Sequence, residues 1–196
     1  MDDLLNINKD LRRIPVIDLS LPTVVLLGSP NVGKSSIVRA VSSGTPEVND
    51  YPFTTRGVSI GHITDHSRDM RFQVMDTPGL LDRPDDERNE MEKLTYASLA
   101  HLPTAAIFVI DHSGLSGEKS TLQAQLNVRA TLKARFPRRP WLDVVSKGDL
   151  PIGEEALKLL PEDSLIISVK NGQNISTLKT EIERMLIHLG GILSNK

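Results

Sequence analysis

The sequence contains no cysteine and no long apolar stretch. Without cysteine, its 196 residues cannot form a disulfide framework, a thiolate metal site or a cysteine nucleophile, and the absence favours a reducing compartment. The longest apolar runs, residues 24–27 and 105–110, have the length of strands, far below the roughly 18 residues of a bilayer-spanning helix. The N-terminal region carries Asp2, Asp3 and Asp10 and no continuous apolar core, which argues against a secretory signal or a transit peptide.

The chain also has little excess charge, with 23 Lys and Arg against 25 Asp and Glu. This balance argues against a domain that holds nucleic acid or a membrane by bulk charge alone. The length suits one ordinary domain, and there is no repeat, low-complexity segment or linker.

Short β-rich runs alternate with longer stretches of helical period. We expect six strands, at residues 24–27, 57–63, 71–75, 105–110, 141–145 and 165–167, and helices at 34–42, 89–101, 118–136, 154–160 and 175–189. This alternation predicts an α/β domain with a mostly parallel sheet and helices on both faces. Residues 64–69 are polar and turn-like, which predicts antiparallel pairing of the second and third strands.

Residues 28–36 read G-S-P-N-V-G-K-S-S and follow the first apolar run directly. They match G-x-x-x-x-G-K-S between a strand and a helix, the context of a phosphate-binding loop whose backbone N–H groups face an anion. We expect Lys34 to reach the outer phosphates and the Ser35 hydroxyl to bind Mg²⁺. The other nucleotide-binding residues predicted in this loop are Ser29, Asn31, Val32, Gly33 and Ser36.

Two further segments suit the triphosphate end of a nucleotide. Asp76 follows the third strand and can hold Mg²⁺ through water, while the amide of Gly79 can bond the γ-phosphate. In residues 51–57 (Y-P-F-T-T-R-G), Thr55 is the predicted hydroxyl ligand of the metal and Thr54 its neighbour. Such a loop loses its anchor when the γ-phosphate leaves, which turns nucleotide state into shape. Lys34, Thr55 and Gly79 are therefore the predicted catalytic groups.

Residues 146–149 (S-K-G-D) end the strand predicted at 141–145. The Asp149 carboxylate can accept two hydrogen bonds from guanine N1–H and the N2 amino group, and the Lys147 stem can lie over the base. Adenine offers no such donor pair, so the wrong base leaves a charge unsatisfied. A P-loop ATPase remains an alternative, against which Asp149 argues.

Together these motifs resemble those of the translation-factor-related P-loop GTPases. In that class, the loop matched by Ser168, Val169 and Lys170 usually reads S-A-K and presents a backbone N–H to guanine O6. The position of Ser146 is usually Asn, so this chain keeps only a hydroxyl there. The resemblance implies a six-stranded sheet with one antiparallel strand, GTP or GDP as ligand, and Mg²⁺. We expect a lead-in at 1–20, the GTPase domain at 21–190 and a tail at 191–196.

Longer stretches of the sequence point to a narrower group within these GTPases. Residues 51–55 look like the Obg superfamily, and residues 76–84 (D-T-P-G-L-L-D-R-P) with 87–89 (E-R-N) resemble its nucleolar GTP-binding protein (Nog) branch. This resemblance implies a switch in assembly of the large ribosomal subunit, with a pre-ribosomal particle, rRNA or a regulatory protein as partner and no membrane. It implies the nucleolus or nucleus, with the cytoplasm or an organelle as alternatives. Because family members extend further at both ends, we expect an excised domain or a short relative.

Leu80 occupies the position where many small GTPases keep a water-orienting glutamine. Because leucine cannot polarise water, we predict slow intrinsic hydrolysis. Related GTPases with Asn at the position of Asn31 can recruit K⁺ beside the phosphates, although Asn31 can also simply tolerate a tight turn. A guanine-nucleotide-sensing module with negligible turnover, which recruits a protein or RNP partner, is the alternative to an enzyme.

Two charged segments have two interpretations each. Residues 82–92 form either a solvated loop and helix start or a partner surface that moves with the nucleotide. The basic cluster of Lys133, Arg135, Arg138 and Arg139 either suits a helix C-terminus or contacts RNA. The five histidines show no metal-ligand spacing.

Overall fold

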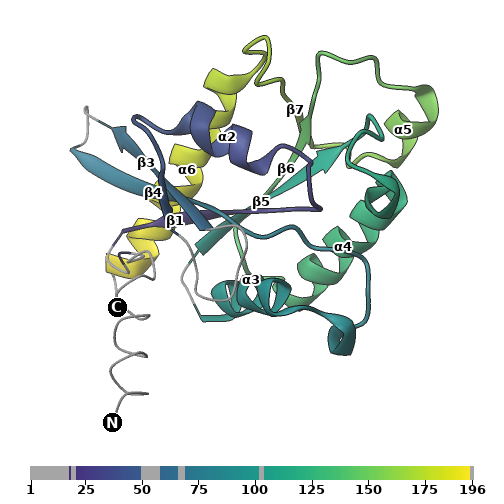
Figure 1. The fold of residues 1–196 in the computed structure, drawn as a ribbon. Coiled ribbons are helices and arrows are strands. Elements are labelled where there is room, and N and C mark those ends of the chain that lie inside the picture. The colour runs from purple at the N-terminus through teal and green to yellow at the C-terminus, as the bar shows by residue number, and fades with distance from the viewer. Residues whose placement is uncertain (1–17, 19–20, 50–57, 66–68, 102–103, 195–196) are drawn as a thin grey trace.

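The fold is a seven-stranded sheet with helices on both faces, in the order β2-β3-β4-β1-β5-β6-β7 (Figure 1). The computed structural model describes residues 18, 21–49, 58–65, 69–101 and 104–194. The strands are β1 (Thr23–Leu27), β2 (Glu47–Asn49), β3 (Val58–Asp65), β4 (Met70–Asp76), β5 (Thr104–Asp111), β6 (Trp141–Ser146) and β7 (Leu165–Ile166). The helices are α2 (Lys34–Val41), α3 (Glu90–His101), α4 (Leu122–Arg135), α5 (Glu154–Leu159) and α6 (Ile175–Ser194), with the 3-10 turns η1 (Asp85–Glu87) and η2 (Glu118–Ser120).

The predicted architecture is confirmed, with one strand more than the six we expected. Within the described residues, β3 alone runs against the others, pairing antiparallel with both β2 and β4. The additional strand β2 has three residues, of which only Val48 is apolar, and so it leaves no alternating pattern in the sequence.

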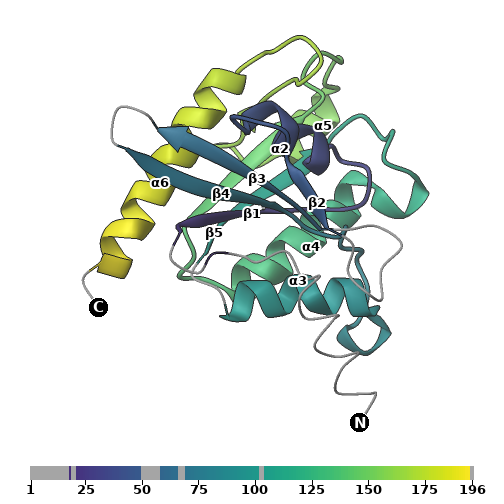
Figure 2. The ribbon, with the colours of Figure 1, turned by 60° about the vertical axis from the view of Figure 1, so that its left-hand side comes forward.

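The sheet has a hydrophobic core on each face, and consecutive residues of β1 contribute to opposite sides. Val24 and Leu26 pack with residues of α2 and α6, whereas Val25 and Leu27 pack with residues of α3 and α4. Figure 2 shows α6 along one side of the sheet and α3 and α4 along the other. Burial on both faces explains why β1 reads as a continuous apolar run.

The helix predicted at residues 175–189 is confirmed, and it buries an apolar stripe. Leu178, Ile182 and Leu186 are fully buried against the sheet, and Leu189 is buried beside them. The helix continues to Ser194, so that residues 191–194, which we expected in a tail, are helical.

The parallel strands determine where the functional loops lie. Because β1 pairs parallel with β4 and β5, and β5 with β6, the loops after these strands leave from one edge of the sheet. That edge carries the segments that begin at Gly28, Thr77, His112 and Lys147.

Candidate functional site

The loop between β1 and α2 wraps tightly. Gly28 and Gly33 have φ of 140° and 104°, and Asn31 has φ of 62°. A Cβ atom on Gly28 would lie 2.5 Å from the carbonyl oxygen of Val109 in β5, so only glycine permits this approach. This is the conformation that a phosphate-binding loop requires.

Lys34, the first residue of α2, is almost fully buried at the mouth of this loop. Its Nζ donates hydrogen bonds to the carbonyl oxygens of Gly28 at 3.1 Å and Ser29 at 2.8 Å. Burial lowers the pKa of Lys34 to about 8, against the opposing attraction of Asp76. The amine is therefore held where phosphate oxygens would meet the loop, and an anion there would favour its charged form.

A contact between Ser35 and Asp76 joins the start of α2 to the end of β4. The Ser35 hydroxyl donates a hydrogen bond to Oδ2 of Asp76, while Oδ1 is buried with no protein partner. Burial raises the pKa of Asp76, with Ser35 and Lys34 opposing that shift. A hydroxyl beside a carboxylate with an unsatisfied oxygen is a donor set that suits a hard divalent cation and its water ligands.

The segment after Asp76 lies against the phosphate loop. The Thr77 hydroxyl donates to the Leu26 carbonyl at 2.6 Å, and the Leu80 amide donates to the Gly28 carbonyl at 3.0 Å. A Cβ on Gly79 would lie 2.5 Å from the backbone nitrogen of Pro30. The Leu80 side chain is 2% exposed and packs in the core beneath α3. The predicted ligand Thr55 and its neighbour Thr54 lie outside the described residues.

The predicted base-binding residues line one pocket of about 470 Å³. In it, Asp149 accepts a hydrogen bond from the Ser168 hydroxyl at 2.6 Å, and Lys170 Nζ lies 3.6 Å from its carboxylate. The Ser168 bond is the main cause of a lowered pKa of Asp149. The pocket lining includes Val32, Gly33, Ser36, Lys147, Asp149, Ser168, Val169 and Lys170. The structure thus brings both predicted base-binding segments together with the phosphate loop.

The backbone joins these segments as well. The Gly148 amide donates to the Ile167 carbonyl at 2.8 Å, and a Cβ on Gly148 would lie 2.7 Å from the Ile166 side chain. Lys147 has φ of 58°, which turns the chain sharply at the end of β6. The Ser146 hydroxyl donates to the carbonyl oxygen of Val32 at 2.7 Å and lies 3.2 Å from the carbonyl oxygen of Ile110.

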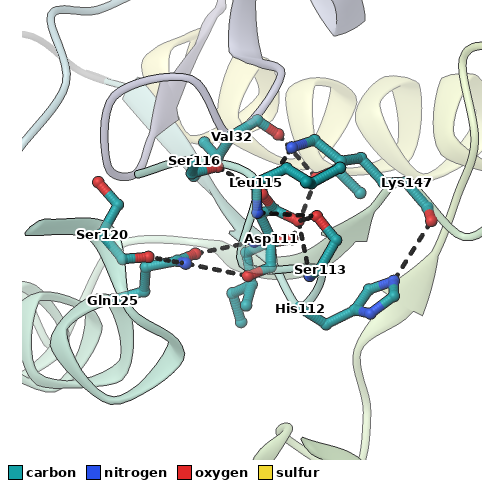
Figure 3. A network of polar contacts seen from close by, with 11 residues as sticks. Val32, Asp111, His112, Ser113, Leu115, Ser116, Ser120, Gln125 and Lys147 are labelled. Atoms are coloured by element: carbon teal, nitrogen blue, oxygen red, sulfur yellow. Dashed lines mark hydrogen bonds and ion pairs between the residues drawn. The ribbon is translucent and has the colours of Figure 1, made fainter. Parts of the chain in front are cut away.

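Sequence reasoning missed a polar network behind Lys147 (Figure 3). At its centre, the buried Asp111 pairs with Lys147, with 2.6 Å between Nζ and Oδ2. Burial raises the pKa of Asp111, but hydrogen bonds from Lys147, Ser113 and Ser116 lower it by more. The pKa therefore lies below its usual value. A carboxylate at the end of the apolar strand β5 was the available signal, because charge in that position needs a partner.

The charged segment at 82–92 is largely exposed, and several of its side chains also contact the helices. Asp82 accepts a bond from Asn127 of α4 at 2.8 Å, and Asp85 pairs with Arg88 and Arg135. Buried Glu92 accepts hydrogen bonds from the amides of Leu81 and Asn89, and it pairs with Arg83. Its carboxylate therefore joins the start of α3 to the segment after Gly79.

Most of the basic cluster has intramolecular partners. Arg135 lies 5.0 Å from the centre of the Tyr96 ring as well as beside Asp85, and Lys133 lies 5.9 Å from that of Trp141. Arg139 donates to backbone carbonyls of Leu99 and Thr104. These contacts favour the structural interpretation of the cluster over RNA contact.

In the described part of the chain, no three His, Asp or Glu side chains gather as a metal-binding group. Within the same residues, no helix has both the length and the apolar character needed to cross a membrane.

A tight glycine loop with a buried lysine, a Ser–Asp pair with an unpartnered carboxylate oxygen and a pocket, all on one edge of a parallel sheet, define a P-loop nucleotide-binding domain. The family described as 50S ribosome-binding GTPase matches residues 23–147, more than half of the chain. The chain therefore belongs to that family and is a GTP-binding GTPase domain. The predicted resemblance to the nucleolar GTP-binding protein branch is also confirmed.

Nucleolar GTP-binding protein 1 of Arabidopsis thaliana is 40% identical over 160 residues, which cover 80% of this chain and 23% of that protein. The protein of the same name from Saccharomyces cerevisiae is 32% identical over 191 residues, or 93% of this chain and 28% of that protein. The chain thus spans about a quarter of the length of these curated relatives.

Solved structures agree on the fold. A crystal structure described as that of nucleolar GTP-binding protein 1 of Plasmodium falciparum has a TM-score of 0.70 and 28% identity, covering 92% of this chain and 95% of that one. Era, solved with MgGDPNP and a segment of 16S ribosomal RNA, has a TM-score of 0.60 at 20% identity, covering 85% and 57%. At that identity, Era shows the shared fold alone.

Proposed function

We propose that this GTPase domain is a Mg²⁺-dependent switch with slow intrinsic hydrolysis. The observation that carries the proposal is the contact between Ser35 and Asp76, which leaves one buried carboxylate oxygen unpartnered beside the Lys34 amine. A buried carboxylate oxygen without a partner destabilises a fold. Such an oxygen therefore supports a bound ion or its water as the missing partner.

Mg²⁺ fits this donor set, with Ser35 as a direct ligand, Asp76 acting through water and Thr55 completing the protein ligands. When bound, the ion supplies positive charge to the phosphates. Lys34 neutralises the outer phosphates, and the Gly79 amide donates to the γ-phosphate. Ser29, Asn31, Val32, Gly33 and Ser36 hold the phosphates from the loop. Lys147, Asp149, Ser168, Val169 and Lys170 hold the base.

Slow hydrolysis follows from the burial of Leu80, whose side chain packs in the core and has no polar group to orient water. We also propose that K⁺ beside Asn31 stimulates turnover. Asn31 also has a left-handed φ, so its presence is equally explained by the tight turn alone. A measurement must separate K⁺ recruitment from this conformational role. Single-turnover rates in potassium and in sodium separate them, and equal rates would exclude the potassium effect.

The cellular role that we propose is assembly of the large ribosomal subunit in the nucleolus. The family description and the names of the relatives support this role. We expect the domain to bind pre-ribosomal particles, by contact with rRNA or a protein, more tightly with a GTP analogue than with GDP. Cosedimentation with isolated particles checks this, and equal binding in both nucleotide states would contradict a switch.

The site itself is tested by competition of GTP, XTP and ATP against labelled GDP in the wild type, and against labelled XDP in Asp149→Asn, which is expected to lose guanine nucleotides. We expect the wild type to prefer GTP over ATP and XTP, and Asp149→Asn to lose GTP and gain XTP, because an amide donor then meets the xanthine oxygen. Asp163→Asn, which changes an exposed aspartate in the loop before β7, is the matched control. If ATP competes as well as GTP, the assignment of the base is wrong.

A further inference from the structure

The buried Asp111 carboxylate is surrounded by four hydrogen-bond donors. It accepts hydrogen bonds from the Ser113 amide at 2.8 Å, from the Ser113 hydroxyl at 2.6 Å and from the Ser116 hydroxyl. Its fourth partner is the Lys147 ammonium, at 2.6 Å. Asp111 is 1% exposed, so the carboxylate does not exchange these donors for water. Figure 3 shows the carboxylate at the centre of this network, with Lys147 on one side and Gln125 on the other.

Its backbone is fixed from the opposite side. The Gln125 side chain accepts a bond from the Asp111 amide at 2.8 Å and donates to the Asp111 carbonyl at 2.9 Å. The side-chain amide group of Gln125 also donates to the Ser120 carbonyl at 2.7 Å, and Gln125 itself is fully buried in α4. The carboxylate is therefore held in place by the fold, so it can define the position of whatever it binds.

The partners of Asp111 connect it to the base pocket in two ways. Lys147 lines that pocket, and its ammonium is tied to Asp111 at the far end of the side chain. Leu115 lines the same pocket from the loop that Ser113 and Ser116 attach to Asp111, and its amide donates to the Ser113 hydroxyl at 3.3 Å. Leu115 is 70% exposed, more than Leu157, Leu159 or Val169, the other exposed large apolar side chains in the described part of the chain.

We propose that Asp111 is a positioning residue for the nucleotide base: it holds the stem of Lys147 and, through the 112–117 loop, the side chain of Leu115 against the two sides of the pocket mouth. The inference rests on the proposed base site and deepens it. Tying down the long lysine side chain before binding reduces the conformational freedom lost on binding. A planar, largely apolar base face offers Leu115 the contact that it lacks.

A double-mutant cycle in the full chain tests the link to Lys147. We expect Asp111→Asn and Lys147→Ala each to weaken GDP binding roughly tenfold, since each breaks a hydrogen bond between charged groups. If Asp111 acts through Lys147, adding Asp111→Asn to Lys147→Ala should weaken binding little further. Full additivity of the two losses would overturn the proposal.

Asp143→Asn is the matched control, since Asp143 is a buried carboxylate of β6 whose partners Arg129 and Trp141 do not line the pocket. We expect it to lower thermal stability and to leave the GDP dissociation constant unchanged. A loss of GDP affinity in Asp143→Asn as large as that in Asp111→Asn would show that general destabilisation explains both, and would overturn the positioning role.

Leu115→Ser tests the proposed contact between Leu115 and the base. Because Leu115 is exposed, we expect the substitution to leave folding intact. We expect a several-fold faster dissociation of fluorescent GDP, while Leu157→Ser, at an exposed leucine of α5, leaves it unchanged. Equal rates for Leu115→Ser and wild type would remove Leu115 from the proposal. The proposed base site fails separately, if the wild type does not prefer GTP over XTP and ATP.

Discussion

The hydroxyl of Ser146, at the end of β6, donates a hydrogen bond of 2.7 Å to the carbonyl oxygen of Val32 in the phosphate loop, 114 residues away. Both residues are buried, and the same hydroxyl lies 3.2 Å from the Ile110 carbonyl in β5. A short side chain thus ties the base-binding strand to the phosphate-binding loop. This contact explains how Ser can stand where related GTPases usually have Asn.

Ser146→Ala should therefore weaken nucleotide binding. The Val32 carbonyl would lose its side-chain donor in a buried place, at a cost of about 1–3 kcal/mol, and we expect GDP affinity to fall roughly five- to tenfold. Isothermal titration measures the change. Ser164→Ala removes a hydroxyl that bonds only the Pro161 carbonyl, and it should leave GDP affinity unchanged. Unchanged affinity in Ser146→Ala would show that the tie is dispensable.

The lowered pKa of Lys34 predicts a pH dependence of phosphate binding. With a pKa of about 8 in the free protein, the amine loses its charge as the pH rises through 8, whereas bound phosphates favour the charged form. GDP affinity should fall roughly tenfold between pH 7.5 and 9. GMP, which lacks the outer phosphate, serves as the control for ionisation of guanine, and parallel curves for GDP and GMP would contradict the prediction.

Leu80→Gln should not create a faster enzyme. Because the Leu80 side chain is buried with Tyr96 and Leu99, a glutamine there would leave its amide without partners and destabilise the fold by about 2–4 kcal/mol. Urea unfolding and single-turnover hydrolysis are the measurements. Leu80→Met keeps the volume and should cost less than about 1.5 kcal/mol. A stable Leu80→Gln variant with faster hydrolysis would contradict the burial argument.

Gly79→Ala should uncouple the γ-phosphate segment from the phosphate loop. The added Cβ would lie 2.5 Å from the Pro30 nitrogen, and because this is backbone, the two segments must separate. We expect GTP hydrolysis to fall roughly tenfold or more, as the amide donor moves away, while GDP binding changes little. Gly153→Ala, at a glycine with open space around it and φ of −67°, is the control. Equal hydrolysis in both variants would argue against a catalytic Gly79 amide.

The sequence alone was enough to predict six of the seven strands of the described residues, the helices and the nucleotide-binding motifs, because their physical requirements are local. The β1 run, the glycines at Gly28 and Gly33 and the apolar stripe of α6 each record a constraint on a few consecutive residues. Parallel strands then bring the segments after β1, β4 and β6 to one edge without further information. The short strand β2 escaped prediction, because three residues carry no period. The role of Thr55 stays a prediction.

Only the tertiary structure decided which side chains meet across the chain. It placed the Leu80 side chain in the core, and it showed that Arg135 and Arg139 have protein partners, which the sequence left open. It also revealed the pairing of Asp111 with Lys147. Arg135, Arg139 and Asp111 meet partners 35 or more positions away in the sequence. Such contacts depend on the packing of whole strands and helices, whereas a loop motif depends on its own backbone.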